Sequence, residues 1–366
     1  MPLTAGIVGM PNVGKSTLFN AITSSTVEAA NYPFATINPN TGTVEVYDER
    51  LEVLTKKFNS QKTIPTIFEF KDIAGLVKGA SKGEGLGNQF LSNIRETDAI
   101  CHVVRCFENG DILHVDGTVD SIRDAETINL ELIFADMDTV QRRIDRIAKK
   151  AQTGDKESKN EYNAIKPVLD ALEKGLPARS VELDESEDKY VRNLCLLTKK
   201  PMIYVANMGE EDLNDPSSNR HYVRLCELAE KEHCLVVPIC AKMEEELCML
   251  SKEEKKMFLD DLGLKMSGLD DLIMTAYKTL NLETFFTAGE KETRAWTFKK
   301  GMKAPQCAGV IHSDFERGFI KAEVYSYDDL VKYETELGVK EAGRLRVEGK
   351  EYVFKDGDIA FFRFNV

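Results

Sequence analysis

The sequence predicts an α/β protein, a doubly wound parallel sheet with an inserted antiparallel helical hairpin, followed by a smaller C-terminal α+β domain. Three observations support this prediction. Short apolar runs recur up to residue 239, a heptad-spaced apolar series interrupts them, and new strand patterns begin near residue 283. The domains are therefore expected at 1–282 and 283–366, with the hairpin at about 120–192.

Five apolar runs are expected to form the parallel strands. Runs with so little alternation are typical of strands covered on both faces. Helical or loop patterns lie between them, which favours a doubly wound arrangement. The runs are residues 3–8, 64–72, 99–105, 201–207 and 235–239.

Apolar residues at alternating spacings of three and four predict two helices between the third and fourth runs. Gly154 and Asp155 can turn the chain between them, so a hairpin is expected, and the alternative is a pair of ordinary packed helices. Pro167 interrupts the second series. The first series is Leu130, Ile133, Met137, Val140, Ile144, Ile147 and Ala151, and the second is Tyr162, Ile165, Leu169, Leu172 and Leu176.

The composition excludes several classes of protein. The net charge is −13, from 48 Lys and Arg against 61 Asp and Glu, so a diffuse basic surface that grips nucleic acid is ruled out. The eight cysteines form no CxxC pair and are expected to be reduced thiols. No apolar run is long enough to span a bilayer and no signal peptide is evident, so we expect a cytoplasmic protein without membrane contact.

The strongest chemical signal is a glycine-rich loop between the first predicted strand and the helical pattern that follows. Residues 9–16, GMPNVGKS, match the phosphate-binding pattern GxxxxGK[ST] in the context that this pattern requires. Lys15 is expected to contact the β- and γ-phosphates, as a catalytic residue, and the Ser16 hydroxyl to bind Mg²⁺. The residues expected around the phosphates are Asn12, Val13, Gly14, Lys15, Ser16 and Thr17.

Two further segments follow in the order of a nucleotide switch. Thr36, in the polar stretch 31–39, is a candidate Mg²⁺ ligand and γ-phosphate sensor. Asp72 ends an apolar run and is expected to support Mg²⁺, while the Gly75 N–H is expected to face the γ-phosphate. This order is typical of GTPase-type switches.

Together these motifs resemble the YchF/Obg-like ATPases, a branch of the Obg family of P-loop NTPases. The resemblance covers essentially the whole chain, and the stretch DIAGLVKGASKGEGLG is its most specific part. It implies that the C-terminal part is a TGS domain, a β-grasp module. The residues that carry it are 9–16, 31–40 and 72–87, the helical insertion, and 312–315, 318–322 and 356–359 in the C-terminal domain.

The base-recognition segment departs from the guanine-specific pattern Asn-Lys-x-Asp. Asn207 is kept, but Met208 and Glu210 replace the usual Lys and Asp. A Glu, one methylene longer, need not reach both guanine donors, and a buried donor left unpaired costs about 1–3 kcal/mol. We therefore expect Asn207 and the Met208 backbone to bind adenine and ATP to be preferred over GTP, as the resemblance also implies. The resemblance places Cys240 and Ala241 beside the base.

Leu76 occupies the position at which Ras-like enzymes carry the glutamine that orients the attacking water. Hydrolysis is therefore expected to be slow, or to need another group. His114 is one candidate, and the resemblance implies a catalytic histidine there; the alternative is a structural or exposed loop histidine. In related P-loops with the asparagine found here at position 12, its carbonyl helps to hold K⁺, which joins Mg²⁺ as a candidate cofactor.

The expected activity is Mg²⁺-dependent hydrolysis of ATP to ADP and phosphate as a switch. The resemblance implies the ribosome as partner, at its large-subunit or intersubunit surface. A basic stripe on the first predicted helix is a candidate contact for ribosomal RNA, and the alternative is a solvated helix face. The rival functions are a true GTPase and a ribosome-binding module whose hydrolysis is incidental. The stripe consists of Arg142, Arg143, Arg146, Lys149 and Lys150.

Overall fold

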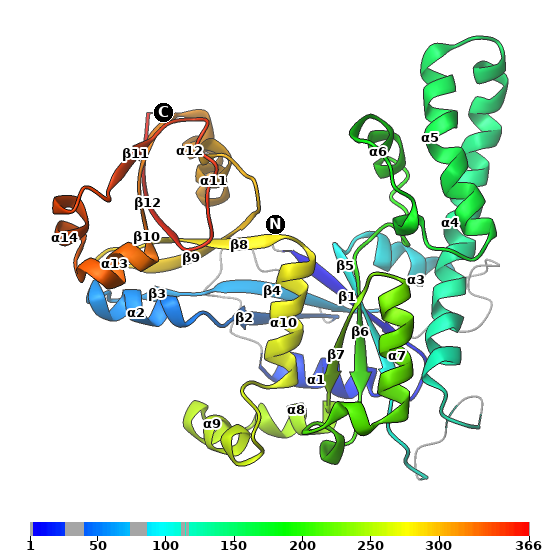
Figure 1. Ribbon diagram of the computed structural model, residues 1–366, viewed down its shortest axis with the longest axis horizontal. Helices are drawn as coiled ribbons and strands as arrows, with labels where there is room; N and C mark the ends of the chain where they lie inside the picture. Colours follow the sequence, from blue (N-terminus) through cyan, green and yellow to red (C-terminus); the bar gives the residue numbers. More distant parts are fainter. Residues whose placement is uncertain (1–2, 26–39, 74–85, 111–113, 115–116, 366) are drawn as a thin grey trace. The chain divides into compact units, whose positions relative to one another are not determined.

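The computed structural model describes residues 3–25, 40–73, 86–110, 114 and 117–365. The chain forms two compact units (Figure 1). One consists of Met1–Val44 and Glu69–Ala276, and the other of Glu45–Phe68 and Tyr277–Val366. The first unit contains the predicted nucleotide-binding motifs.

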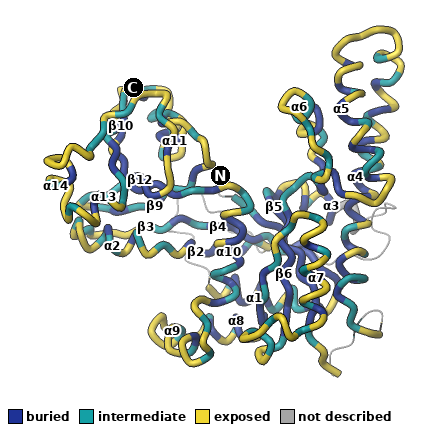
Figure 2. Tube along the Cα trace, in the orientation of Figure 1, coloured by how far each residue is buried: buried dark blue, intermediate teal, exposed yellow. Residues whose placement is uncertain are grey.

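The first unit is built on a sheet with the strand order β2-β4-β1-β5-β6-β7. β1 pairs in parallel with β4 and β5, β5 with β6, and β6 with β7. Every residue of β5 and β6 is buried (Figure 2), as expected for central strands covered on both faces. The strands are β1 Thr4–Gly9, β2 Thr41–Val46, β4 Thr66–Asp72, β5 Ala99–Arg105, β6 Met202–Asn207 and β7 Leu235–Ile239.

The predicted run 64–72 is in fact two strands. β3 (Thr63–Ile64) pairs with β9 (Thr293–Lys299), and both belong to the second unit. β4 begins only at Thr66. Pro65 lies between them, and a proline has no N–H with which to continue a strand ladder. The sequence analysis also missed β2.

Helices connect the strands of the first unit, and several begin at a side-chain cap. The Asp120 carboxylate accepts from the N–H groups of Ile122 and Arg123, and Asn219 and Ser251 cap later helices in the same way. None of the helices in the described part of the chain is both long and apolar enough to cross a bilayer. The helices are α1 Lys15–Ser24, α3 Leu86–Arg95, α4 Ser121–Gln152, α5 Lys156–Glu173, α6 Glu185–Arg192, α7 Arg220–Lys231, α8 Ala241–Leu247, α9 Lys252–Asp261 and α10 Gly268–Thr279.

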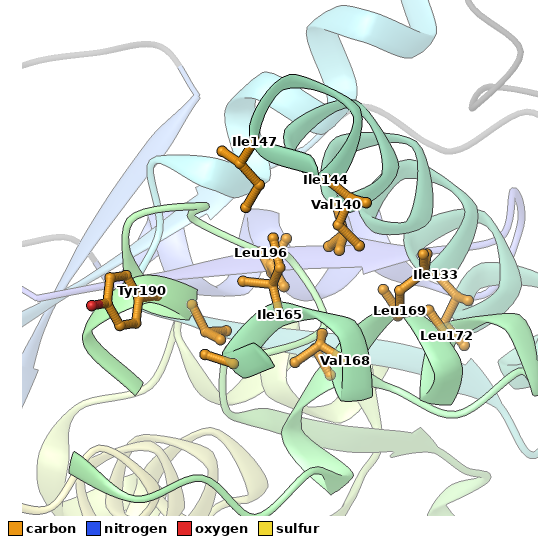
Figure 3. Close-up of a cluster of buried hydrophobic side chains, with 13 residues drawn as sticks. Ile133, Val140, Ile144, Ile147, Ile165, Val168, Leu169, Leu172, Tyr190 and Leu196 are labelled. Atoms are coloured by element: carbon orange, nitrogen blue, oxygen red, sulfur yellow. The ribbon is translucent and has the colours of Figure 1, made fainter. Parts of the chain in front are cut away.

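The predicted helical hairpin is formed by α4 and α5, with α6 packed beside them (Figures 1 and 3). The chain reverses at residues 153–155. Buried side chains from both helices form one apolar cluster, in which Val140 and Ile144 of α4 lie near Ile165 and Leu169 of α5. The predicted fold class is confirmed, including this hairpin.

The two ends of the predicted apolar series do not belong to this cluster. Leu130 is 43% exposed and Leu176 is 48% exposed. α5 ends at Glu173, so Leu176 lies beyond the helix, and Leu130 lies too far along α4 from the turn to meet an 18-residue partner. Heptad spacing marks a helical face, but the length of the partner helix decides how much of that face is covered.

The second unit is an α+β module with the strand order β11-β10-β12-β8-β9-β3. β8 and β9 form an antiparallel hairpin, and β12 runs parallel to β8, an arrangement that agrees with a β-grasp. Aromatic rings dominate its core, where Phe285 contacts Phe298, Phe354 and Phe362. Its remaining elements are α2 Glu49–Lys57, β8 Leu282–Thr287, α11 Ala304–Ile311, α12 Ser313–Arg317, β10 Phe319–Ser326, α13 Tyr327–Tyr333, α14 Glu336–Glu341, β11 Arg346–Glu348 and β12 Asp358–Phe364.

The compact units differ from the predicted split at residue 282 in two respects. The C-terminal part of the second unit begins earlier, at Tyr277. Residues 45–68 belong with the C-terminal residues, although they are distant from them in sequence. Leu51 and Leu54 of α2 are buried in a cluster with Phe286 and Leu330. Arg50 also forms an ion pair of 2.6 Å with Asp356. These contacts join sequence-distant segments, which a pattern of local periodicity cannot detect.

The hairpin core predicts different costs for two leucines of the same predicted series. Leu169→Ala removes a side chain that is 3% exposed, and we expect it to destabilise the protein by about 2–5 kcal/mol. Leu176→Ala, at a position 48% exposed, should change stability by less than about 0.5 kcal/mol. Chemical denaturation followed by circular dichroism measures both. Equal losses for the two variants would contradict the assigned hairpin core.

Candidate nucleotide site

The phosphate-binding loop joins the end of β1 to the start of α1. Asn12 and Gly14 both have positive φ angles, of 63° and 90°. A β-carbon on Gly14 would also overlap the side-chain amide of Asn207, so this position needs glycine for both its conformation and its space. The loop thereby turns the N-terminus of α1 toward the carboxyl edge of the sheet, and a helix N-terminus favours bound anions.

Lys15, the first residue of α1, forms an ion pair with Asp72 at the end of β4. Asp72 is the last residue of β4 and is in register with Ile7 of β1, so parallel pairing brings it to the loop that follows β1. The Lys15 side chain is 11% exposed and that of Asp72 is 26% exposed. Each charge thus balances the other at an edge that solvent can reach.

Asn207 connects the phosphate loop to the segment that precedes α8. Its Nδ2 donates to the Val13 carbonyl at 2.8 Å, and its Oδ1 accepts from the Ala241 N–H at 3.0 Å. The residue is 4% exposed, and its own carbonyl accepts from the Cys106 N–H at 2.8 Å. Three loops at the carboxyl edge of the sheet are therefore held by one asparagine. A bracing role, which the sequence analysis did not assign, accounts for most of its hydrogen-bonding capacity.

Met208 has a buried side chain and a hydrogen-bonded backbone N–H. Its side chain is buried, with the residue 2% exposed, and its N–H donates to the Ile239 carbonyl at 2.8 Å. Cys240 is the N-cap residue of α8 and is 6% exposed, and burial raises the pKa of its thiol. Glu210 is exposed at the start of a short 3₁₀ turn. No buried Asp stands at this position to bind the paired donors of guanine.

His114 lies against the first turn of α4. Its Nε2 is 2.8 Å from Asp124 Oδ2, and both side chains are almost completely buried, at 3% and 2% exposed. Arg123 also contacts the pair, at 3.2 Å from Asp124 Oδ1. The sequence analysis missed Asp124, because an acidic residue in the first turn of a helix is ordinary and signals no particular function.

Arg105 is a second residue that the sequence analysis missed. It is 1% exposed at the end of β5. Its guanidinium donates to the carbonyls of Phe107 and Asn109, both at 3.1 Å, and lies 4.5 Å from the centre of the Phe107 ring. Burial lowers the pKa of this guanidinium. These contacts hold the segment that leads from β5 toward His114.

Several predicted site residues lie outside the residues that the structure describes. They are Thr36 and the rest of the segment 31–39, together with Gly75 and Leu76. The residues that the structure brings to one edge of the sheet are Gly14, Lys15, Asp72, Asn207 and Ala241.

Two family models match the chain. The model MMR_HSR1, described as a 50S ribosome-binding GTPase, matches residues 4–136. The model YchF-GTPase_C, described as a protein of unknown function, matches residues 282–365. The first match covers the phosphate loop and Asp72 and ends before Asn207, and the second covers the C-terminal part of the second unit.

Relatives of known name align with the whole chain. The ribosome-binding ATPase YchF of Bacillus subtilis (strain 168) is 59% identical over 366 residues, 100% of both chains. The protein of the same name from Escherichia coli O157:H7 is 52% identical, again over 100% of both. The solved structure of the Schizosaccharomyces pombe YchF GTPase has a TM-score of 0.89 and 41% identity, covering 99% of this chain and 97% of that one.

A buried carboxyl group lies on the helix that follows Cys240. Glu244 is 1% exposed, and its Oε1 accepts from the Gly268 N–H at the start of α10 at 2.8 Å. Burial raises the pKa of Glu244 to about 7. Ionisation of this side chain therefore opposes folding. The native state loses stability as the pH rises from about 4.5, the ordinary pKa of a glutamate side chain, to about 7.

The raised pKa of Glu244 predicts the effect of Glu244→Gln on stability. The neutral amide keeps an oxygen for the Gly268 N–H, so the variant should gain up to about 3 kcal/mol relative to the native protein at pH 8. At pH 5 the difference should largely disappear. Thermal unfolding at both pH values, with the exposed Glu246→Gln as control, measures this. A variant no more stable than the native protein at pH 8 would contradict the raised pKa.

Proposed function

The chain belongs to the YchF family, and from this premise we propose that it works as a Mg²⁺-dependent, ribosome-associated ATPase switch. It hydrolyses ATP to ADP and phosphate, as do relatives named ribosome-binding ATPase that are 59% and 52% identical over their full length. A ribosome partner implies action in the cytoplasm. The single observation in the structure that supports the proposal best is the junction of the phosphate loop, Asp72 and Asn207 at one sheet edge.

The site's own residues suggest how ATP is bound. Backbone N–H groups at the start of α1 contact the phosphates, with Val13 and Thr17 on either side of the Gly14–Ser16 turn. Lys15 leaves Asp72 and turns to the β- and γ-phosphates, which carry more negative charge than one carboxylate. Binding thus exchanges one ion pair for another, so Lys15 remains paired throughout.

The residues present suit Mg²⁺, which prefers oxygen ligands. The exposed Ser16 hydroxyl and the Asp72 carboxylate lie at the same edge, and Thr36 would join them. Among the described residues, no group of three or more His, Cys, Asp or Glu side chains could hold a metal. Phosphate oxygens and water would therefore complete the ligand set. Mg²⁺, when bound, neutralises charge on the β- and γ-phosphate oxygens.

Water activation is proposed to depend on His114, because Leu76 cannot orient water. An imidazole can orient water through a nitrogen lone pair. Gly75 would sense the γ-phosphate and couple its loss to the switch. Asn12, which has a positive φ at the mouth of the loop, is proposed to place its side-chain carbonyl for a K⁺ ion.

Base choice is proposed to come from backbone groups. The Met208 N–H already donates to Ile239, so its carbonyl is the group that can accept from the adenine amino group. Guanine has a carbonyl oxygen at that position, which would face another acceptor. Cys240 and Ala241 would line the opposite side of the base. This argument favours ATP, although the S. pombe relative is named a GTPase.

The hairpin is the proposed contact with ribosomal RNA, but only part of its basic stripe is available. Arg142 pairs with Asp138 on the same helix, and Arg143 forms hydrogen bonds of 2.6 and 2.8 Å with Glu161 of α5. Three cations close to the hairpin tip are exposed, namely Arg146, Lys149 and Lys150. We therefore propose that these three cations contact RNA phosphates at the hairpin tip.

The first prediction tests the nucleotide. Glu210→Asp, alone and with Met208→Lys, should shift the ATP/GTP affinity ratio toward GTP by about tenfold, because one recovered guanine hydrogen bond is worth about 1–3 kcal/mol. Dissociation constants for both nucleotides, titrated side by side against native protein, measure the shift. The single variant leaves the buried Met208 unchanged. As a control, Lys15→Ala should weaken the binding of ATP and of GTP to the same extent. An unchanged ratio would show that positions 208 and 210 do not determine the choice between ATP and GTP.

The second prediction tests the RNA contact. Reversing Arg146, Lys149 and Lys150 to Glu should weaken ribosome binding and remove much of its salt dependence, because counterion release is lost. ATP turnover in isolation should stay unchanged. Co-sedimentation with ribosomes at two salt concentrations measures the effect, with the ATP-bound and ADP-bound states compared.

A matched control comes from the same unit. The exposed lysines Lys252, Lys256 and Lys265, reversed to Glu, give the same change in net charge away from the hairpin. If both triple variants co-sediment equally, the hairpin is a solvated face and the contact lies elsewhere. Equal binding of ATP-bound and ADP-bound protein would favour a binding module over a switch.

A further inference from the structure

We propose that the uncovered half of one sheet face in the second unit binds single-stranded RNA, with a base stacked on Phe361 and a phosphate held by Lys321 and Arg363. This inference goes beyond the proposed contact at the hairpin tip, because it names a different surface and a different kind of recognition. It does not depend on the nucleotide site.

The sheet of the second unit has one face that helices cover only in part. Strands β10 and β12 are neighbours in this sheet, and their side chains alternate between its two faces. On the first face, Val324 and Phe362 are buried in a cluster with residues of α11. On the second face, Tyr325 and Ile359 are in register and are buried in a cluster with residues of α2 and α13. The next two residue pairs along the second face are much more exposed.

This uncovered part carries an aromatic ring and two cations. Phe361 is 55% exposed and is in register with Glu323 of β10, whose partner on the other side is Val347 of β11, 63% exposed. Lys321 is directly opposite Arg363, and their side chains are 43% and 54% exposed. The Arg363 guanidinium lies 4.3 Å from the centre of the Phe361 ring. An apolar ring and positive charge therefore lie side by side on this face.

The two cations are not fully neutralised by their acidic neighbour. One oxygen of Glu323 lies 3.6 Å from Lys321 Nζ and 3.8 Å from Arg363 Nε, and both distances are too long for a hydrogen bond. Like charges directly opposite on neighbouring strands destabilise a sheet. Two cations beside one carboxylate leave a local positive charge, in a chain whose total charge is −13. A bound anion would relieve the repulsion between the cations.

Single-stranded RNA has the chemistry that fits this surface. Its bases stack on aromatic rings and on guanidinium planes, and its phosphates pair with Lys and Arg side chains. Phe361 and Arg363 are two residues apart, about 7 Å along β12, which a single nucleotide can span from base to phosphate. In a duplex the bases stack on one another, so a single strand is the form that this face can recognise.

Stability of the sheet alone does not account for the arrangement. Aromatic residues favour strands, and a guanidinium over the ring of Phe361 adds some stability. Neither effect requires Lys321 to stand opposite Arg363, a pairing that costs stability. The solvated face of an antiparallel sheet also usually carries polar residues, whereas Phe361 and Val347 are exposed here.

The test measures the binding of full-length protein to a fluorescein-labelled single-stranded RNA of about ten nucleotides, with ADP present to fill the nucleotide site. Phe361→Ala should weaken binding about tenfold, because it removes the stacking platform for one base. Phe361→Tyr keeps an aromatic ring and should bind within about twofold of the native protein. Position 361 is exposed, so both variants should keep the native melting temperature, which thermal unfolding checks.

A double variant, Lys321→Ala with Arg363→Ala, tests the phosphate contact. The loss of two contacts should reduce the slope of log affinity against log salt concentration by about 1.4. The matched control removes two exposed lysines elsewhere on the same unit, Lys299→Ala with Lys340→Ala, and should leave the slope near native. Leu337→Ala, at a position 64% exposed on α14, is the control for Phe361→Ala and should bind RNA like the native protein.

Three results would overturn the inference. The first is a Phe361→Ala variant that binds the single strand as tightly as the native protein does. The second is a Phe361→Ala variant that loses affinity for a matched duplex to the same extent as for the single strand. The third is displacement of the labelled RNA by polyglutamate as effectively as by unlabelled RNA, because the surface would then recognise negative charge alone, as on an acidic protein.

The variant with Arg146, Lys149 and Lys150 reversed to Glu separates the two RNA proposals. If this variant loses single-strand binding while Phe361→Ala keeps it, the hairpin contact stands and the present inference fails. If Phe361→Ala weakens RNA binding but the native protein does not co-sediment with ribosomes, the inference stands and the proposed ribosome partner falls.

Discussion

The parallel pairing of β1 with β4 and β5 is the constraint on which the rest of the first unit depends. Parallel strands end at the same edge, so the loop after β1, Asp72 at the end of β4 and Arg105 at the end of β5 are brought to one edge of the sheet. Every residue of β5 and β6 is buried, so both faces of these strands are covered and they lie at the centre of the sheet. The Lys15–Asp72 pair then forms between the first residue of α1 and the last residue of β4.

Asn207 links the phosphate loop to the start of α8 at this edge of the sheet. Its amide contacts the phosphate loop on one side and the start of α8 on the other, so the two regions proposed to bind the phosphates and the base share one brace. The close approach also explains Gly14, since any side chain there would displace the amide. With Asn207 engaged and Met208 buried, the base is left with backbone groups, which suits the absence of a conventional Asp at position 210.

Helix α4 extends from this edge to the hairpin tip. Its 32 residues span about 48 Å. Asp124 in its first turn contacts His114, Asp136 near its middle binds the backbone at 197–198, and its last turns form the hairpin core with α5. One continuous helix therefore contacts the loop proposed to act in hydrolysis and carries the surface proposed to meet the ribosome, a physical route between the two.

The sequence by itself determined the fold class, the phosphate loop and the apolar faces of the hairpin, because these depend on local spacing and on the chemistry of neighbouring residues. It could not show that residues 45–68 join the C-terminal unit, that Leu130 and Leu176 are exposed, or that Pro65 divides a predicted strand between two sheets. Nor could it pair His114 with Asp124 or Asn207 with Val13. Those outcomes depend on which sequence-distant segments pack together, and only the tertiary structure decides how long a partner helix is and which side chain closes each hydrogen bond.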